Sequence, residues 1–252
     1  DVIGVFTRSV QDTALVVDVM SGSDGLDSTM IEREDSYDLS GYSISGKKIG
    51  VIREYLEGLD PEIKARLDVA IEKLKSAGAV IDKVSLPSLP LALAVYYVIV
   101  PAEVSSNLSR YDGQRYGYSE QNTGNLDESY ELSRSNGFGT EAKRRIMIGT
   151  HVLSSGYYDA YYKKAQTVRT KIINEFRHAF NEFDFLIGPT APNIAFNIGD
   201  IMTVAVNLAG IPAISIPNGT IDGMPVGVQL MANQRKDKDL LSVSKIYEEI
   251  AS

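Results

Sequence analysis

The most patterned stretch of the chain is Gly137 to Phe183, which reads GFGTEAKRRIMIGTHVLSSGYYDAYYKKAQTVRTKIINEFRHAFNEF. It opens with a basic cluster, Lys143 to Arg145, and passes through a tyrosine-dense turn, Gly156 to Tyr162. Apolar residues then recur at steps of three and four, which is the period of one helix face. These residues are Tyr161, Ala165, Val168, Ile172, Phe176 and Phe180. The pattern predicts a long helix that builds a core, and it leaves open whether the stretch also holds a ligand.

The residues before this stretch predict a strand–helix–strand unit over residues 47–86. Lys47–Ile52 and Ala79–Leu86 are short apolar runs typical of strands. Pro61–Ala77 carries an apolar stripe at helical spacing, and Asp60 precedes the proline in the order favoured at a helix start. Such a crossover places its two strands in parallel with a right-handed connection.

The remaining segments continue the alternation of helices and strands. Apolar periodicity predicts helices at Ser9–Ser21, Leu89–Leu108 (a buried helix), Thr203–Leu208 and Lys238–Ala251. It predicts strands at Phe183–Pro189, Ala213–Pro217 and Val226–Met231. A turn is expected at Gly219–Pro225, and a loop with short helical turns at Ser109–Asn136. This alternation predicts a layered α/β fold.

Composition narrows the function classes. The 252 residues are 44% hydrophobic and 23% charged, with a net charge of −8. Because there is no cysteine, thiol nucleophiles, disulfides and thiolate metal sites are excluded. The acidity argues against a broad phosphate-binding surface.

We expect no run of apolar residues to be long enough to span a membrane, and no signal peptide is visible. Because Asp1 follows no initiator methionine and its neighbours read as mid-domain, we expect a fragment.

Most motifs in the chain have structural explanations. The Gly137-Phe138-Gly139 run resembles a dinucleotide fingerprint, but the polar segment before it is no strand. His151 and His178 lack a partner at metal-ligand spacing, so we expect no metal site. The basic cluster has two interpretations: a solvated face, or one arginine that turns inward to grip a carboxylate. Adjacent side chains on a helix point about 100° apart, so Arg144 and Arg145 can differ in this respect.

Five blocks of the sequence carry a resemblance to a known family. They are Asp1–Arg8, Ser105–Tyr118, Gly139–Gln166, Gly188–Pro192 and Val206–Pro217. Together they resemble the amidase signature family. Within it, SSNLSRYDG (105–113) and SSGYYDAYYKKAQ (154–166) are similar to the glutaminase subunits of tRNA-dependent amidotransferases. The resemblance implies a layered α/β/α fold with a mixed central sheet. It implies that residues 1–252 are the C-terminal portion of a single domain without its N-terminal part, and that 137–183 is a helical segment on the substrate side.

The resemblance also implies a function. Such a glutaminase hydrolyses glutamine and supplies ammonia to the B partner of the complex, which uses ATP and Mg to convert Glu-tRNA(Gln) to Gln-tRNA(Gln), while the C partner braces the pair. The family's serine nucleophile, second serine and lysine are expected upstream of Asp1. No catalytic residue, metal or cofactor is therefore expected on this chain, and the fragment alone is expected to be inactive. The complex is expected to be cytoplasmic and free of the membrane.

Three positions match the family's glutamine-binding residues. Tyr96 matches a tyrosine that contacts the substrate, and Arg145 matches the arginine that pairs with the α-carboxylate. Asp200 matches the aspartate that holds the α-ammonium group. The family has a longer segment where Gly199-Asp200-Ile201 joins directly here, so Asp200 is either the acid after that segment or the residue before it.

Two other functions remain open from the sequence. The chain could be part of a standalone amidase that acts on another small amide, for which a paired Arg145 and Asp200 would be unnecessary. It could also be a non-catalytic assembly fragment that docks the B and C partners of such a complex.

Overall fold

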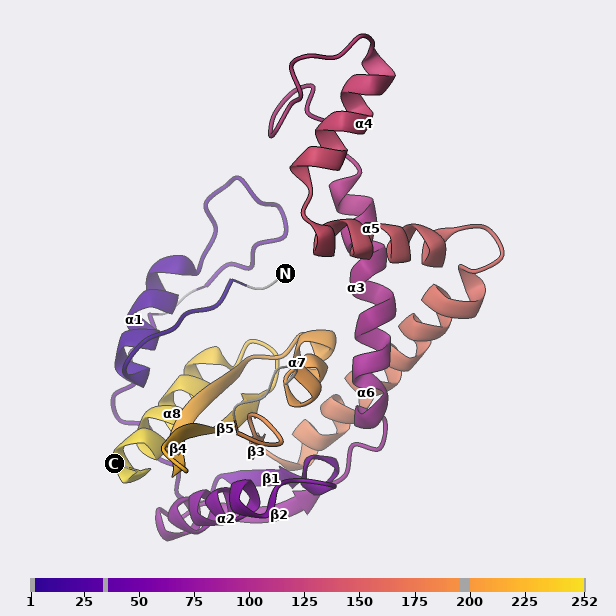
Figure 1. Cartoon of the computed structure of the whole chain (residues 1–252). Coiled ribbons are helices and arrows are strands. Elements are labelled where there is room, and N and C mark those ends of the chain that lie inside the picture. Colours follow the sequence, from indigo (N-terminus) through magenta and orange to yellow (C-terminus); the bar gives the residue numbers. More distant parts are fainter. Residues whose placement is uncertain (1–2, 34–35, 195–199, 252) are drawn as a thin grey trace. The chain divides into compact units, whose positions relative to one another are not determined.

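The computed structural model describes residues 3–33, 36–194 and 200–251, and the chain forms two compact units (Figure 1). The sheet unit comprises Asp1–Pro90 and Ile172–Ser252, and the helical unit comprises Leu91–Lys171.

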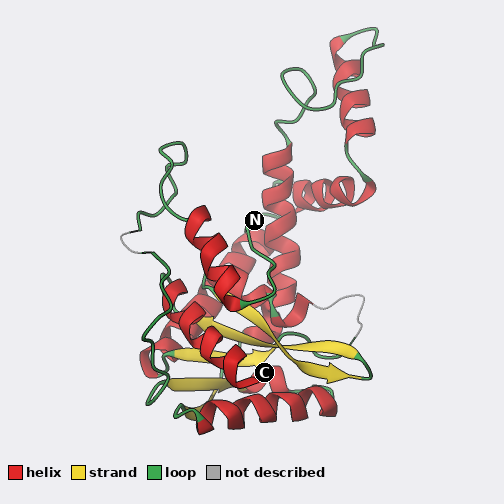
Figure 2. Ribbon diagram, turned by 90° about the vertical axis from the view of Figure 1, so that its left-hand side faces the viewer, coloured by secondary structure: helices red, strands yellow, loops and turns green. Residues whose placement is uncertain are grey.

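A five-stranded mixed sheet organises the sheet unit (Figure 2). Its strands are β1 (Lys48–Ile52), β2 (Val80–Val84), β3 (Phe185–Pro189), β4 (Ala213–Ile221) and β5 (Met224–Ala232), in the order β2-β1-β3-β5-β4. β1 runs parallel to β2 and β3, whereas β5 runs antiparallel to β3 and β4. The predicted α/β fold with a mixed central sheet is therefore confirmed.

The predicted crossover unit is also confirmed. Helix α2 (Pro61–Ser76) connects β1 to β2, and Lys48 is paired in register with Val80. Asp60 caps the helix, because its carboxylate accepts a hydrogen bond from the backbone N–H of Glu62 at 2.8 Å. This cap and the first-turn proline fix where α2 begins.

The main core of the sheet unit lies where α2 and α8 (Asp237–Ala251) pack on the sheet. Fully buried members of the core include Ile49, Leu67, Leu74, Phe185, Ile187, Leu230 and Tyr247. The Tyr247 hydroxyl donates to Asn218 Oδ1 at 2.8 Å, so the one polar atom of this large side chain is satisfied. Helix α1 (Val10–Met20) joins a smaller cluster with Leu241 of α8.

Short helices complete the sheet unit. They are η1 (Arg53–Leu56), η2 (Leu89–Leu91, at the boundary between the units), η4 (Asp200–Met202) and α7 (Val204–Ala209). Helix α7 stops at Gly210, whose φ of 66° is the left-handed conformation that favours glycine at a helix end. The buried Gln229 of β5 donates to the carbonyl of Met202 at 2.9 Å, which ties η4 to the sheet.

The helical unit contains α3 (Ala92–Leu108), α4 (Leu126–Gly137), α5 (Thr140–Leu153), the π-helical turn η3 (Asp159–Lys163) and the start of α6 (Lys164–Glu182). Helices α3 and α5 pack at very close range. A Cβ atom built on Gly149 of α5 would lie 1.9 Å from the carbonyl oxygen of Pro101 in α3. Only a glycine permits this approach of the two backbones.

Helix α4 corrects the prediction of a loop through Asn136. Asn125 caps this helix by accepting from the N–H of Glu128 at 2.9 Å, and Glu128 accepts in return from the N–H of Gly124 at 2.6 Å. The side of α4 that is buried carries Ser129 and Ser133, which accept hydrogen bonds from the preceding loop. A helix with a polar buried side shows no apolar stripe, which is why periodicity missed it.

The β4–β5 hairpin has its turn within the predicted segment Gly219–Pro225, but the turn is shorter than predicted. The strands extend to a two-residue turn, Asp222-Gly223, in which both residues have positive φ (50° and 76°). This is the type I′ geometry that Asp-Gly favours. The other residues of the expected turn lie in the two strands, with a register shift between Pro217 and Thr220.

Helix α6 begins later than its stripe predicted. The turn η3 precedes it, and Tyr161 is exposed rather than buried. From Ala165 onward the pattern is confirmed, with Ile172 and Phe176 fully buried. Glu175 also accepts from the N–H and hydroxyl of Ser88 at 2.9 and 2.6 Å, which anchors this end of α6 within the sheet unit.

The segment Leu89–Leu108 is long and apolar enough to cross a membrane by length and composition, with a mean hydropathy of 1.5. The expectation that no run reaches this threshold is therefore wrong, although a core helix of a soluble protein passes the same test. Only a third of the segment is buried, and Tyr97 is exposed, so α3 is buried along one face and not all round as the sequence suggested.

The contact between Gly149 and Pro101 makes a prediction about stability. Helix propensity alone favours Gly149→Ala by about 1 kcal/mol. The clash with a backbone carbonyl should outweigh it, and we expect the free energy of unfolding to fall by about 1–3 kcal/mol. Denaturant titration followed by circular dichroism measures this change. Met147→Ala on the exposed face of α5 is the control, with an expected effect within about 0.5 kcal/mol. A stabilised Gly149→Ala variant would show that the two backbones can separate freely.

Candidate functional site

The structure brings together two of the three residues that were predicted to bind substrate. Arg145 of α5 donates a hydrogen bond from Nη1 to the hydroxyl of Tyr96 in α3 at 3.0 Å. The guanidinium carbon also lies 6.0 Å from the centre of the Tyr96 ring, within the range of a cation–π contact. The side chain of Arg145 is 30% exposed, so the guanidinium is anchored on one side and accessible on another.

Packing of α3 against α5 explains why these two side chains meet. Tyr96 lies just over one turn before Pro101, and Arg145 lies one turn before Gly149. The close backbone contact between Pro101 and Gly149 therefore sets the spacing of the two helices at the next turn. On the other side of that contact, the hydroxyls of Ser105 and Thr150 lie 2.8 Å apart and share a hydrogen bond.

Glu141 is a third member of this group, and the sequence analysis missed it. Its carboxylate accepts from Arg145 Nε at 2.8 Å, and from Arg144 Nε and Nη2 at 2.8 Å each. Glu141, Arg144 and Arg145 occupy positions i, i+3 and i+4 of α5, which lie on the same helix surface. The spacing Glu-x-x-Arg-Arg was the signal that could have revealed the group.

Electrostatics keep Glu141 and Arg145 ionised. Hydrogen bonds from Arg144 first, and then from Arg145, lower the pKa of Glu141 from its ordinary 4.5 to about 2. The hydrogen bond with Tyr96 first, and then that with Glu141, raise the pKa of Arg145 above its usual value. Glu141 is thus a carboxylate and Arg145 a cation throughout the neutral range.

The two interpretations of the basic cluster can now be compared. The Arg144 side chain is 58% exposed, whereas that of Arg145 is 30% exposed and directed to Tyr96. One arginine is solvated and its neighbour is turned toward α3, as the 100° offset of adjacent residues allows. The geometry matches the inward-facing interpretation for Arg145, and the substrate role of Tyr96 and Arg145 stays a prediction.

Asp200 is the third predicted residue. It is the first residue of η4 in the sheet unit, and its side chain lies outside the part that the structure describes. Its role toward an ammonium group stays a prediction.

His151 lies beside tyrosine rings. The His151 ring lies 4.2 Å from that of Tyr157, in an exposed group that also includes Tyr161. Within the described residues, no cluster of three or more histidine, aspartate or glutamate side chains could hold a metal ion.

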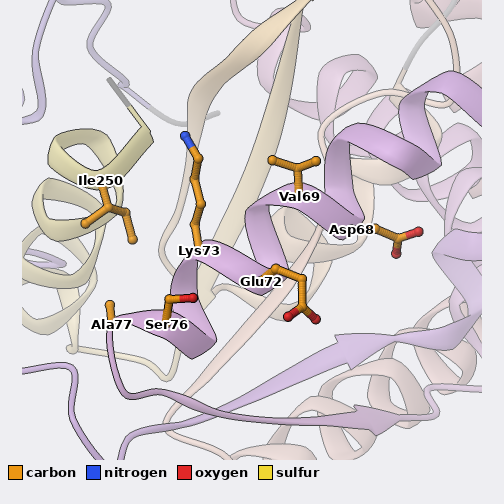
Figure 3. Close-up of a pocket in the computed structure, with 7 residues that line it drawn as sticks. All are labelled: Asp68, Val69, Glu72, Lys73, Ser76, Ala77 and Ile250. Carbon is orange, nitrogen blue, oxygen red and sulfur yellow. The ribbon is translucent and has the colours of Figure 1, made fainter.

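Surface hollows of the described residues lie apart from Tyr96 and Arg145. The first, of about 610 Å³, lies on the sheet unit between α2 and the end of α8, and Figure 3 shows the stem of Lys73 and the side chains of Val69 and Ile250 around it. Lys73 Nζ donates to the carbonyl of Ala251 at 3.0 Å. The second, of about 490 Å³, lies beside Arg110 and Tyr130 in the helical unit. Among the described side chains, those of Tyr96 and Arg145 line neither hollow.

The sequence of the chain is similar to those of known proteins. The chain is 47% identical over 263 residues to the A subunit of glutamyl-tRNA(Gln) amidotransferase from Staphylococcus aureus, covering 98% of this chain and 54% of the relative. It is 45% identical to the same protein of Macrococcus caseolyticus, with 99% and 55% covered. The chain therefore spans about half the length of the curated relatives it matches.

Solved structures have the same fold as this chain. The A subunit of glutamyl-tRNA(Gln) amidotransferase from Thermotoga maritima superimposes with a TM-score of 0.71 at 34% identity, over 94% of this chain and 50% of that one. A bacterial aryl acylamidase of the amidase signature family has a TM-score of 0.74 over 97% of this chain and 52% of that one, at 21% identity, which shows the fold alone. The Amidase family matches residues 1–241, and the chain belongs to the amidase signature family.

Proposed function

We propose that the protein containing this chain is the glutamine-hydrolysing subunit of an amidotransferase that converts Glu-tRNA(Gln) to Gln-tRNA(Gln). Support comes from the relatives named as A subunits of glutamyl-tRNA(Gln) amidotransferase, which are 45–48% identical over nearly the whole chain. The likeness to the Thermotoga maritima protein, at 34% identity, agrees with this proposal.

The observation that carries the proposal is the hydrogen bond between Tyr96 and Arg145. Free glutamine presents a carboxylate at one end and the reactive amide at the other. A guanidinium whose position is fixed on one side and open on another is suited to bind a carboxylate through two parallel N–H bonds. Holding that end of the substrate would direct the amide toward a nucleophile. In this proposal Asp200 holds the α-ammonium group, which completes recognition of a free amino acid.

The rest of the machinery in this proposal lies beyond the 252 residues. The serine nucleophile, second serine and lysine of the family are assigned to the part of the protein that this chain does not span. The B partner receives the ammonia and activates Glu-tRNA(Gln) with ATP and Mg, and the C partner braces the assembly. We propose that the whole complex is soluble and cytoplasmic.

Two other functions are less well supported. A standalone amidase for an apolar amide would have no use for an anchored arginine at the substrate. The aryl acylamidase, a solved structure with this fold, is only 21% identical to the chain. A non-catalytic assembly fragment would also leave the Tyr96–Arg145 pair without a role.

The first test is Arg145→Ala in the full-length protein with its partners. Loss of an arginine–carboxylate contact costs about 2–5 kcal/mol in a desolvated site. Because Arg145 is partly exposed, we expect the lower end, or roughly a 30-fold rise in the KM for glutamine. Steady-state ammonia release measures this KM, and circular dichroism checks that the fold is kept.

Lys143→Ala is the matched control, because it removes a neighbouring positive charge of the same cluster and should leave the KM within about twofold. An Arg145→Ala variant with the glutamine KM of the parent protein would rule out the carboxylate role.

The second test uses the 252-residue chain by itself. Since the proposed nucleophile lies in the part that this chain does not span, we expect the purified chain to release no ammonia from glutamine above the uncatalysed rate. The full-length protein with its partners is the positive control. Ammonia release by the chain alone would place a nucleophile within these residues.

A further inference from the structure

We infer that Glu141 is a positioning residue for Arg145 and that it sets which edge of the guanidinium is offered to the substrate carboxylate. Arg144 takes part by sharing the charge of Glu141. This inference rests on the proposed function, since it concerns how the same arginine binds the same carboxylate. It assigns Glu141 and Arg144 roles that act through Arg145 and not by contact with the substrate.

The hydrogen-bond donors of Arg145 support this inference. A guanidinium offers a carboxylate two edges, one formed by Nε and Nη2 and the other by Nη1 and Nη2. Glu141 occupies Nε, which closes the first edge. Tyr96 takes one of the two hydrogens on Nη1. Within the described residues, the other Nη1 hydrogen and both on Nη2 make no hydrogen bond, so the donors that remain for a carboxylate are on the two Nη atoms.

Charge explains why this arrangement can still attract an anion. If Glu141 bound Arg145 alone, the pair would be neutral. Glu141 instead accepts two hydrogen bonds from Arg144 and one from Arg145. One carboxylate between two guanidinium groups leaves a net positive charge, which a substrate carboxylate would neutralise. Arg144 therefore keeps Arg145 electropositive while Glu141 holds it in place.

The local backbone makes the contact rigid. Glu141 lies in the first turn of α5, where the helix dipole favours a negative side chain. Arg145 lies four residues later on the same surface, and the Gly149 contact with α3 fixes the helix one turn beyond it. The guanidinium is thus held between a carboxylate on its own helix and a hydroxyl on a neighbouring one.

Simple electrostatics predicts the opposite effect for loss of Glu141. If Glu141 only reduced the positive charge near the substrate, its removal would tighten glutamine binding. If it positions Arg145, its removal would release Nε and let the guanidinium rotate, and binding would weaken. The sign of the change in the KM for glutamine distinguishes the two roles.

The experiment measures glutamine hydrolysis by the full-length protein with its partners for Glu141→Ala, Glu141→Gln and Arg144→Gln. Loss of a charge-assisted hydrogen bond that orients the binding group should raise the KM of Glu141→Ala by about tenfold. We expect kcat to stay within about twofold, because the contact is made in both the ground state and the transition state. Glu141→Gln keeps a neutral acceptor and should recover part of the loss. Arg144→Gln should raise the KM by about threefold, because the charge of Glu141 then falls on Arg145 alone.

Glu131→Ala is the control, because it removes an exposed carboxylate from α4 that makes no contact with the arginines in the described residues. A lower or unchanged KM for Glu141→Ala would overturn the positioning role. A fall in kcat with an unchanged KM would do the same. If Arg145→Ala also leaves the KM unchanged, the proposed function fails with it. If Arg145→Ala raises the KM and Glu141→Ala does not, only the role of Glu141 is wrong.

Discussion

The helical unit depends on one close contact, that between the backbone of Gly149 and the carbonyl of Pro101. A proline inside a helix has no N–H to donate, and its ring displaces the preceding turn. Gly149 has no side chain, so the backbone of α3 at Pro101 can approach it closely. Because α3 and α5 approach so closely, the tyrosine and arginine one turn away come within hydrogen-bond distance. The geometry of the Tyr96–Arg145 pair thus follows from a packing constraint between two residues that have no chemistry of their own.

The charged residues near this contact hold the guanidinium of Arg145 in place and leave some of its N–H donors free to bind an anion. A fully paired surface arginine contributes little to binding an anion, and an unpaired flexible one must lose conformational entropy when it binds. The group formed by Glu141, Arg144 and Arg145 avoids both problems. One carboxylate orients the guanidinium, and the second arginine compensates that carboxylate. The low pKa of Glu141 means that this balance does not change with pH in the neutral range.

The sequence predicted the parts of the fold that depend on apolar pattern and on helix caps. Strands β1 to β3, helix α2 with its Asp60 cap and helix α7 were found in this way. It did not reveal α4, whose buried serines carry polar contacts, and it placed the β4–β5 turn over Gly219–Pro225 although the turn itself is only Asp222-Gly223. Contacts between helices distant in sequence, such as that of Tyr96 with Arg145, have no signature in periodicity, and only the family resemblance pointed to them.

In this proposal the arginine, and not the sheet, selects the substrate. The aryl acylamidase shares this architecture at 21% identity, so the fold itself does not specify an amino acid substrate. In this proposal, what separates an enzyme for a charged amino acid from one for an apolar amide is the cost of leaving the Nη donors of Arg145 without a partner. An arginine held in place by Glu141 and Tyr96 would favour a substrate that brings a carboxylate, and it would disfavour one that does not. Specificity in this proposal therefore comes from a charge that the helical unit holds ready before the substrate arrives.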